Sequence, residues 1–165
     1  MAALTAGTSA PEFNLQTMDG KQFSLRDALK RGPVVAAFFK ISCPVCQYTF
    51  PFLERIYKAH GEKKVTIVGI SQNEKKETAG FVKEYSLTFP ILLDDTNTYP
   101  VSNAYGLTNV PTTFWIAQGG EIEIASVGWE RHAIEEINRK AAESNGDGPK
   151  PVFRANESVP DFRAG

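Results

Sequence analysis

Residues 34–46 read VVAAFFKISCPVC, and this stretch is the strongest indication of the fold class. Its first six residues form a continuous apolar run, which is typical of a central strand covered on both faces. A helix-like stretch follows at residues 47–60, and a second apolar run follows at residues 65–70. Because strand, helix and strand come in this order, we expect a βαβ unit with parallel strands, and hence an α/β protein.

The segments on either side extend this pattern. The turn signal Asp19-Gly20 predicts a β-hairpin near the start of the chain, and Gly119-Gly120 predicts a second one. We expect the helix at residues 47–60 to bend or restart at Pro51. The predicted strands are 10–15, 21–25, 34–39, 65–70, 91–93, 112–116 and 121–124, and the other predicted helices are 26–31, 77–85, 101–105 and 129–142.

The chain is expected to form one domain over residues 1–144, followed by a C-terminal tail over residues 145–165. The sequence NGDGP at residues 145–149 ends regular structure, because it is rich in turn-forming residues. The tail has few apolar residues, so we expect it to dock only on the surface. The side chains available for that docking are Val152, Phe153 and Phe162.

Composition and charge narrow the class of protein. The 165 residues are 42% hydrophobic and 22% charged, as in an ordinary folded domain. A net charge of −1 gives no electrostatic case for nucleic acid or an anionic membrane as a partner. No apolar run approaches the ~20 residues that span a bilayer, and the first residues, MAALTAGT, do not resemble a signal peptide. We therefore expect a cytoplasmic protein.

Cys43 and Cys46 are the only two cysteines, and they form one C-x-x-C motif. A thiol at a helix start lies where free N–H groups and the helix dipole favour the thiolate. A structural zinc site would need a second pair of ligands, but His60 and His132 each stand alone. A purely structural disulfide would close a very small loop, and short loops stabilise least. The motif therefore predicts redox chemistry at a dithiol, with no metal and no cofactor.

Several short motifs, in order along residues 10–143, resemble the thioredoxin superfamily in its redoxin and AhpC/TSA-like branch. They are APEF at 10–13, DGK at 19–21, FF at 38–39, CPVC at 43–46, Pro51, YG at 105–106 and VPTTF at 110–114. The resemblance implies a thioredoxin-like fold, in which a central mixed β-sheet carries helices on both faces. It also implies an N-terminal β-hairpin and a strand–helix insertion at about residues 90–106.

The two thiols have distinct expected roles. Cys43 lies nearer the helix start and should attack a substrate disulfide, whereas Cys46 should resolve the resulting mixed disulfide. Pro44 fixes the first helical turn, where its missing N–H costs nothing. Val45 keeps an N–H that is expected to approach the Cys43 sulfur. The predicted activity is thiol–disulfide oxidoreduction.

A second segment, Val110-Pro111, completes the expected site. The resemblance implies a cis bond between these residues, facing the dithiol, with the Val110 backbone free to pair with an extended substrate. The expected partners are a disulfide-containing protein or a small thiol substrate, and a thiol that donates electrons. Nucleic acid and membranes are not expected partners.

Two positions depart from related families. Reductases of the membrane-anchored type often carry a glutamate three residues after the second cysteine, where this chain has Thr49. Plain thioredoxin has a buried aspartate on the strand before the motif, where this chain has Ala37. Deprotonation of Cys46 is therefore expected to rely on water or on a group that the sequence does not identify.

Two alternative functions remain open from the sequence. In a peroxiredoxin-type peroxidase, Cys46 would be the peroxidatic residue of a Pro-x-x-x-Thr-x-x-Cys pattern. Here Phe39 and Cys43 occupy the proline and threonine positions, and Pro111 replaces the family's later arginine. A redox-sensing or copper-binding module is the other alternative, because thiolates favour Cu(I). Neither histidine lies near the motif in sequence.

Overall fold

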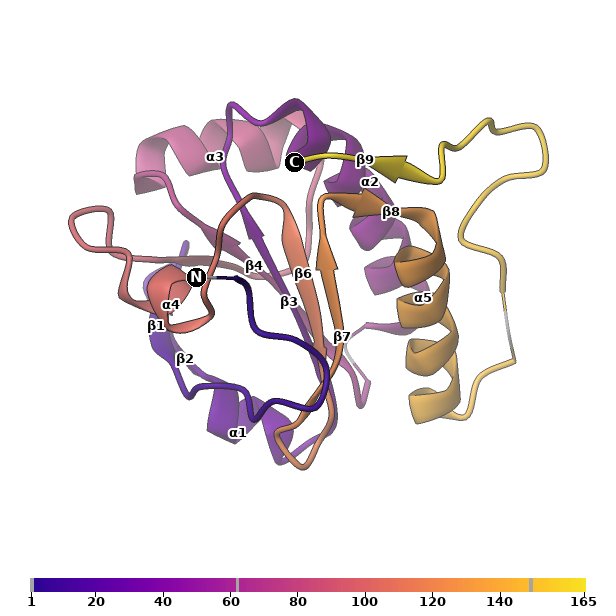
Figure 1. Ribbon diagram of the computed structural model, residues 1–165, viewed down its shortest axis with the longest axis horizontal. Helices are drawn as coiled ribbons and strands as arrows, with labels where there is room; N and C mark the ends of the chain where they lie inside the picture. The colour runs from indigo at the N-terminus through magenta and orange to yellow at the C-terminus, as the bar shows by residue number, and fades with distance from the viewer. Residues whose placement is uncertain (1, 62, 149) are drawn as a thin grey trace.

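The structure, a computed structural model, describes residues 2–61, 63–148 and 150–165. Its centre is a seven-stranded mixed sheet with the strand order β2-β1-β5-β4-β3-β6-β7 (Figure 1). All six residues of β3 are buried, and β3 pairs parallel with β4 and antiparallel with β6. The strands are β1 Asn14–Thr17, β2 Gln22–Ser24, β3 Val34–Phe39, β4 Thr66–Ser71, β5 Ile91–Leu93, β6 Thr112–Ile116 and β7 Ile122–Val127. The expected α/β class and central mixed sheet are confirmed.

Helices cover both faces of this sheet, because alternate side chains of β3 point to opposite sides. Val35, Ala37 and Phe39 pack in one apolar cluster with side chains of α2, α3 and α5. Val34, Ala36 and Phe38 pack in a second cluster, with side chains of α1 and α4. The helices are α1 Leu25–Leu29, α2 Pro44–His60, α3 Lys75–Glu84, α4 Pro100–Ala104 and α5 Arg131–Asn145.

Local signals in the sequence predicted the two hairpins and the βαβ unit. Gly20 and Gly120 have φ angles of +85° and +96°, a backbone conformation that favours glycine. The connection β3–α2–β4 joins parallel strands, as predicted. Helix α2 continues through Pro51 without interruption, so of the expected bend or restart the restart does not occur. Strand β1 begins at Asn14 rather than at residue 10.

The largest difference from the sequence prediction concerns Trp129. The final helix was expected from residue 129, but α5 begins at Arg131. Trp129–Glu130 instead forms a short strand, β8, which pairs antiparallel with β9 at Phe162–Arg163. The partner of β8 lies more than 30 residues away, so no local pattern around Trp129 reveals the pairing.

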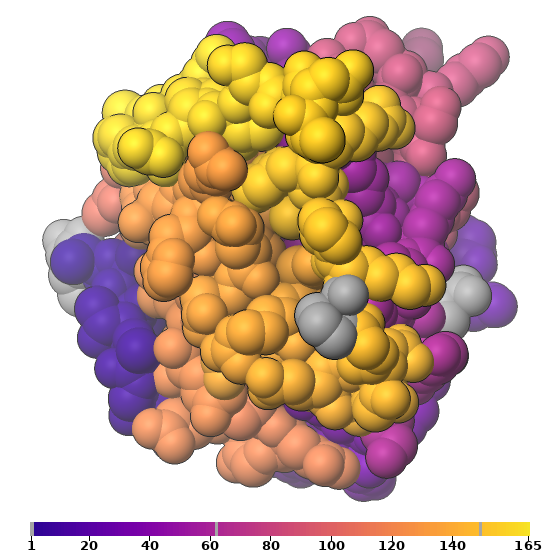
Figure 2. All heavy atoms as spheres, turned by 90° about the vertical axis from the view of Figure 1, so that its right-hand side faces the viewer, coloured from indigo at the N-terminus to yellow at the C-terminus, as the bar shows by residue number. Residues whose placement is uncertain are grey.

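Residues 150–165 of the tail fold back over α5 and α2 (Figures 1 and 2). The Arg55 guanidinium donates two hydrogen bonds of 2.8 Å to the carboxylate of Glu157 and one of 3.1 Å to the Val152 carbonyl. The Trp129 indole N–H donates to the Pro160 carbonyl at 2.7 Å. Val152 is only 8% exposed, so the expectation that it merely docks on the surface is wrong, whereas Phe162 is 59% exposed.

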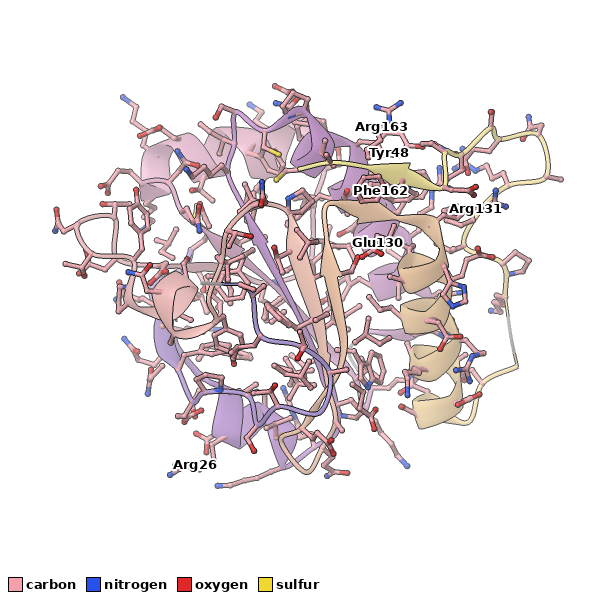
Figure 3. The ribbon with its side chains drawn as sticks, in the orientation of Figure 1. Arg26, Tyr48, Glu130, Arg131, Phe162 and Arg163 are labelled. Carbon is pink, nitrogen blue, oxygen red and sulfur yellow. The ribbon has the colours of Figure 1, made fainter. Side chains whose placement is uncertain are left out.

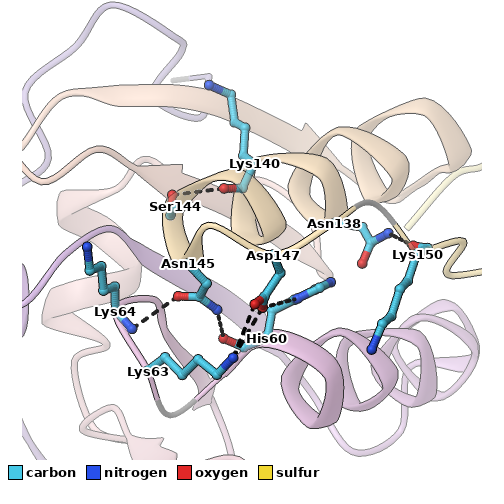
Figure 4. Close-up of polar contacts among 9 residues, drawn as sticks. All are labelled: His60, Lys63, Lys64, Asn138, Lys140, Ser144, Asn145, Asp147 and Lys150. Atoms are coloured by element: carbon cyan, nitrogen blue, oxygen red, sulfur yellow. Dashed lines mark hydrogen bonds and ion pairs between the residues drawn. The ribbon is translucent and has the colours of Figure 1, made fainter.

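The C-terminal ends of α2 and α5 are joined by side-chain hydrogen bonds (Figure 4). The Asn145 amide donates to the His60 carbonyl at 2.5 Å and accepts from the Lys64 N–H at 3.1 Å. The His60 ring nitrogen Nδ1 lies 3.3 Å from the carboxylate of Asp147, which also pairs with Lys63. These contacts lie at the opposite end of α2 from Cys43.

Candidate active site

Cys43 and Cys46 lie at the start of α2, and both are free thiols in the structure. Cys43 is the N-cap residue, with extended backbone angles of −85° and 114°, and Pro44 follows within the first turn. The Cys43 sulfur accepts a hydrogen bond from the Cys46 N–H at 3.1 Å. This is the usual geometry of an N-cap side chain, which accepts from the second or third amide of its helix.

The structure corrects one detail of the predicted site. Val45 was expected to supply the N–H that approaches the Cys43 sulfur, but the hydrogen bond comes from Cys46. The reason is helical geometry, because the third residue after an N-cap turns its N–H back toward the cap. Pro44 keeps its expected place at the helix start.

The two thiols differ in accessibility. Cys43 is partly exposed, whereas Cys46 is 0% exposed and packs among apolar side chains. Burial, followed by the hydrogen bond with Cys43, raises the pKa of the Cys46 thiol well above its ordinary value. Cys46 therefore stays protonated at neutral pH, and Cys43 is the thiol that an incoming molecule reaches first.

The Val110–Pro111 segment faces this thiol pair. Its peptide bond is cis, as the resemblance implied, and the Cys43 thiol lies 3.4 Å from the Val110 carbonyl oxygen that accepts its hydrogen bond. The sheet explains the proximity, since the end of β3 lies beside the start of β6, with Phe38 opposite Thr112. Residues separated by 67 positions in the chain are thereby brought into contact.

A pocket of about 440 Å³ opens beside Cys43. Sequence reasoning identified three of its lining residues, Cys43, Pro44 and Val110, and missed the others. The residues missed are Lys40, Gln72, Leu107, Thr108, Asn109 and Gly165. Most of them sit on loops, where no periodic pattern marks a position as part of a site.

Gly165, at the end of the tail, lines this pocket and lies against the backbone of Val110. A Cβ atom placed on Gly165 would lie 2.2 Å from the Val110 carbonyl oxygen. Asn109 next to it donates a side-chain hydrogen bond of 3.2 Å to the Gly165 carbonyl. The Val110 backbone was expected to be free to pair with an extended substrate, but Gly165 lies directly against its carbonyl oxygen.

Thr49 and Ala37 occupy the positions where related proteins carry an acid. The Thr49 hydroxyl donates to the Val45 carbonyl at 2.7 Å, so it completes a turn of its own helix. Ala37 is fully buried on β3 and has no polar side-chain atom. Neither residue supplies a proton acceptor for Cys46, as expected from the sequence.

The part of the chain that the structure describes holds neither a cluster of metal ligands nor a helix that could span a membrane. Within residues 2–61, 63–148 and 150–165, no group of three or more histidine, cysteine or acidic side chains is arranged to hold a metal ion. Over the same ranges, no helix combines the length and the apolar character needed to cross a bilayer. His60 lies at the far end of α2, about 24 Å along the helix axis from the motif, at a rise of 1.5 Å per residue.

Comparison with known proteins places this geometry in a family. The thiol-disulfide oxidoreductase ResA of Halalkalibacterium halodurans is 34% identical over 134 residues, covering 80% of this chain and 74% of that protein. The thioredoxin-like protein YneN of Bacillus subtilis is 34% identical over 125 residues, covering 74% of this chain and 71% of that protein. The ResA relative confirms the expected enzyme class, an oxidoreductase acting on sulfur groups.

Solved structures agree on the fold. The thioredoxin domain of a thiol-disulfide oxidoreductase from Bacteroides vulgatus superposes with a TM-score of 0.74 at 21% identity, covering 84% of this chain and 98% of that domain. At that identity the likeness concerns the fold alone. The AhpC/TSA family model matches residues 6–125, which include both cysteines and Pro111. The chain belongs to the AhpC/TSA family, with a thioredoxin-like fold.

Proposed function

We propose that the Cys43–Cys46 dithiol exchanges disulfides through a mixed disulfide at Cys43. The observation that carries this proposal is the asymmetry of the pair. Cys43 borders a pocket and accepts a hydrogen bond from the Cys46 N–H, whereas the Cys46 thiol is buried beneath it. In a pair of this kind, a substrate can reach the exposed thiol, and the buried thiol can resolve the mixed disulfide afterwards.

The reaction has two steps. The Cys43 thiolate attacks one sulfur of the substrate disulfide, the substrate S–S bond breaks, and the second substrate sulfur leaves as a thiolate that takes up a proton. Cys46 then loses its proton to water and attacks the Cys43 sulfur, releasing the first substrate sulfur as a thiol. The substrate disulfide gains two electrons, and the protein is left with a Cys43–Cys46 disulfide.

The environment of the two thiols supports this order. The N–H of Cys46 and the start of α2 stabilise negative charge on the Cys43 sulfur. Because burial raises the pKa of Cys46, its thiol does not compete for the substrate in the first step. Once the mixed disulfide forms, the Cys46 sulfur attacks within one helical turn, so no diffusion is needed.

The same observations argue against peroxide reduction at Cys46. That reaction needs a peroxide molecule to reach a Cys46 thiolate, but this thiol is 0% exposed and its pKa is raised. Pro111 stands where a cation would be required. We therefore propose a disulfide-bearing substrate and a thiol electron donor as partners, and the cytoplasmic location stays a prediction.

Two cysteine variants test the proposal. Cys46→Ser should accumulate mixed disulfides with insulin, because the resolving thiol is gone, and Cys43→Ser should form none. Insulin reduction should fall to the uncatalysed rate in both variants, and mass spectrometry should locate the trapped adduct on Cys43. If either variant reduces insulin as fast as the unmodified chain, the proposed function is wrong.

A further inference from the structure

The end of the tail runs along the active-site end of the molecule. Strand β9 places Arg163 opposite Trp129 and Phe162 opposite Glu130, and the Arg131 N–H donates to the Asp161 carbonyl at 2.9 Å. Figure 3 shows Arg163 and Phe162 on this strand, and Arg163 lies close to Tyr48 of α2. The last three residues, 163–165, are named the tip here, and they lead from β8 to the pocket beside Cys43.

The tip packs closely on backbone that borders the dithiol. Gly128 has a φ of +79°, and a Cβ atom there would lie 2.4 Å from the Arg163 carbonyl oxygen. A Cβ atom on Gly165 would lie 2.2 Å from the Val110 carbonyl oxygen, which also accepts from the Cys43 thiol. Glycine at both positions is what permits this approach of two backbones.

The tail is held unequally along its length. Its first part is anchored by the paired Arg55 and Glu157 side chains and by the partly buried bond from Trp129 to Pro160. At the tip, by contrast, Arg163, Ala164 and Gly165 are all exposed. The tip is held by the Arg163 guanidinium, 4.7 Å from the centre of the Tyr48 ring, and by the exposed hydrogen bond of 3.2 Å that the Asn109 amide donates to the Gly165 carbonyl. Exposed contacts of this type are weak, so the tip can be displaced while the rest of the tail stays bound.

The tip covers only one side of the site. The pocket of about 440 Å³ remains open between Cys43, Gln72 and Thr108, so a small molecule reaches the sulfur with the tip in place. The Val110 carbonyl, in contrast, is covered by Gly165. An extended polypeptide that pairs with the Val110 backbone has to move the tip, and a small disulfide does not.

We propose that residues 163–165 determine substrate size in the exchange reaction: the tip admits small disulfides to Cys43 and competes with polypeptide disulfides for the Val110 backbone. This inference rests on the proposed function and adds a specificity element to it. The tail contains no cysteine, so the tip occupies the groove without reacting.

The test compares insulin with 2-hydroxyethyl disulfide as substrates of the full chain. Arg163→Ala removes the contact with Tyr48, and Gly165→Val places side-chain atoms where the Val110 carbonyl lies. Each variant should raise kcat/KM for insulin, mainly through a lower KM. For Arg163→Ala the rise should be about two- to fivefold, the factor expected from the loss of one exposed cation–π contact. The kcat/KM for 2-hydroxyethyl disulfide should change less than about twofold, because that substrate reaches Cys43 without contacting the tip.

Arg26→Ala is the matched control, since Arg26 is an exposed arginine of α1 that lies far from the tip (Figure 3). It should leave both values unchanged. The proposal is overturned if insulin turnover is unchanged or slower in both tip variants, or if the two substrates gain equally. Failure of the unmodified chain and all variants to turn over either disulfide would instead reject the proposed function.

Discussion

The two ends of α2 are built in opposite ways. At the His60 end, side chains from α5 and the residues after it satisfy the last carbonyl and the following loop, and His60 itself is 1% exposed. At the Cys43 end, a partly exposed thiol caps the helix and borders a pocket. One end of α2 is therefore fixed in the fold, and the other end is available for chemistry.

Removing the side chain of Asn145 should give the largest change at the fixed end. Asn145→Ala deletes the hydrogen bond to the His60 carbonyl and the one from the Lys64 N–H. We expect the free energy of unfolding to fall by about 1–2 kcal/mol, because two backbone groups lose their partners. Urea titration measures this change.

Asn156→Ala serves as the control, because Asn156 is an exposed asparagine of the tail. Its effect should stay within about 0.5 kcal/mol. Insulin reduction per folded molecule should be the same for both variants and the unmodified chain, since neither residue touches the dithiol. A slower rate for folded Asn145→Ala would contradict the separation of the two ends.

A smaller effect is expected at Asp147, and it depends on pH. The hydrogen bond with His60, followed by the one with Lys63, lowers the pKa of Asp147 below its ordinary value of 3.8. A carboxyl group with a lowered pKa stabilises the fold above its unfolded pKa, and this contribution is lost as the pH falls through the folded pKa.

As the pH falls below about 4, the Asp147→Asn variant should therefore lose less of its stability than the unmodified chain loses. Both proteins should have the same activity at neutral pH. Thermal unfolding over a pH series checks the difference. Parallel acid sensitivity in the two proteins would show that the pairing with His60 and Lys63 does not stabilise this end.

The same contrast explains what the sequence predicted and what it did not. The central strand β3 and the dithiol could be predicted because each is encoded by residues that are adjacent in the sequence, the apolar run and the C-x-x-C motif. The cis bond before Pro111 came from resemblance to a family, since nothing in the residues themselves requires it.

Apart from the local bond from the Cys46 N–H to the Cys43 sulfur, which was expected from Val45, the contacts that escaped prediction join distant segments. Strand β9 has only two residues, and its partner Trp129 lies in a stretch with helical periodicity, so local pattern favoured a helix there. Gly165 carries no side chain that marks it as part of a site, and only the folded chain places it against Val110. For the same reason, the sequence predicted that the tail docks only on the surface.

The most direct test of the central claim is alkylation of the reduced protein with iodoacetamide at pH 7, followed by mass mapping. The account predicts that Cys43 is labelled first, because its thiol is accessible, and that Cys46 remains unlabelled while the protein is folded, since it is 0% exposed and its pKa is raised. Preferential labelling of Cys46 would contradict the assignment of roles and would favour peroxide reduction at that thiol.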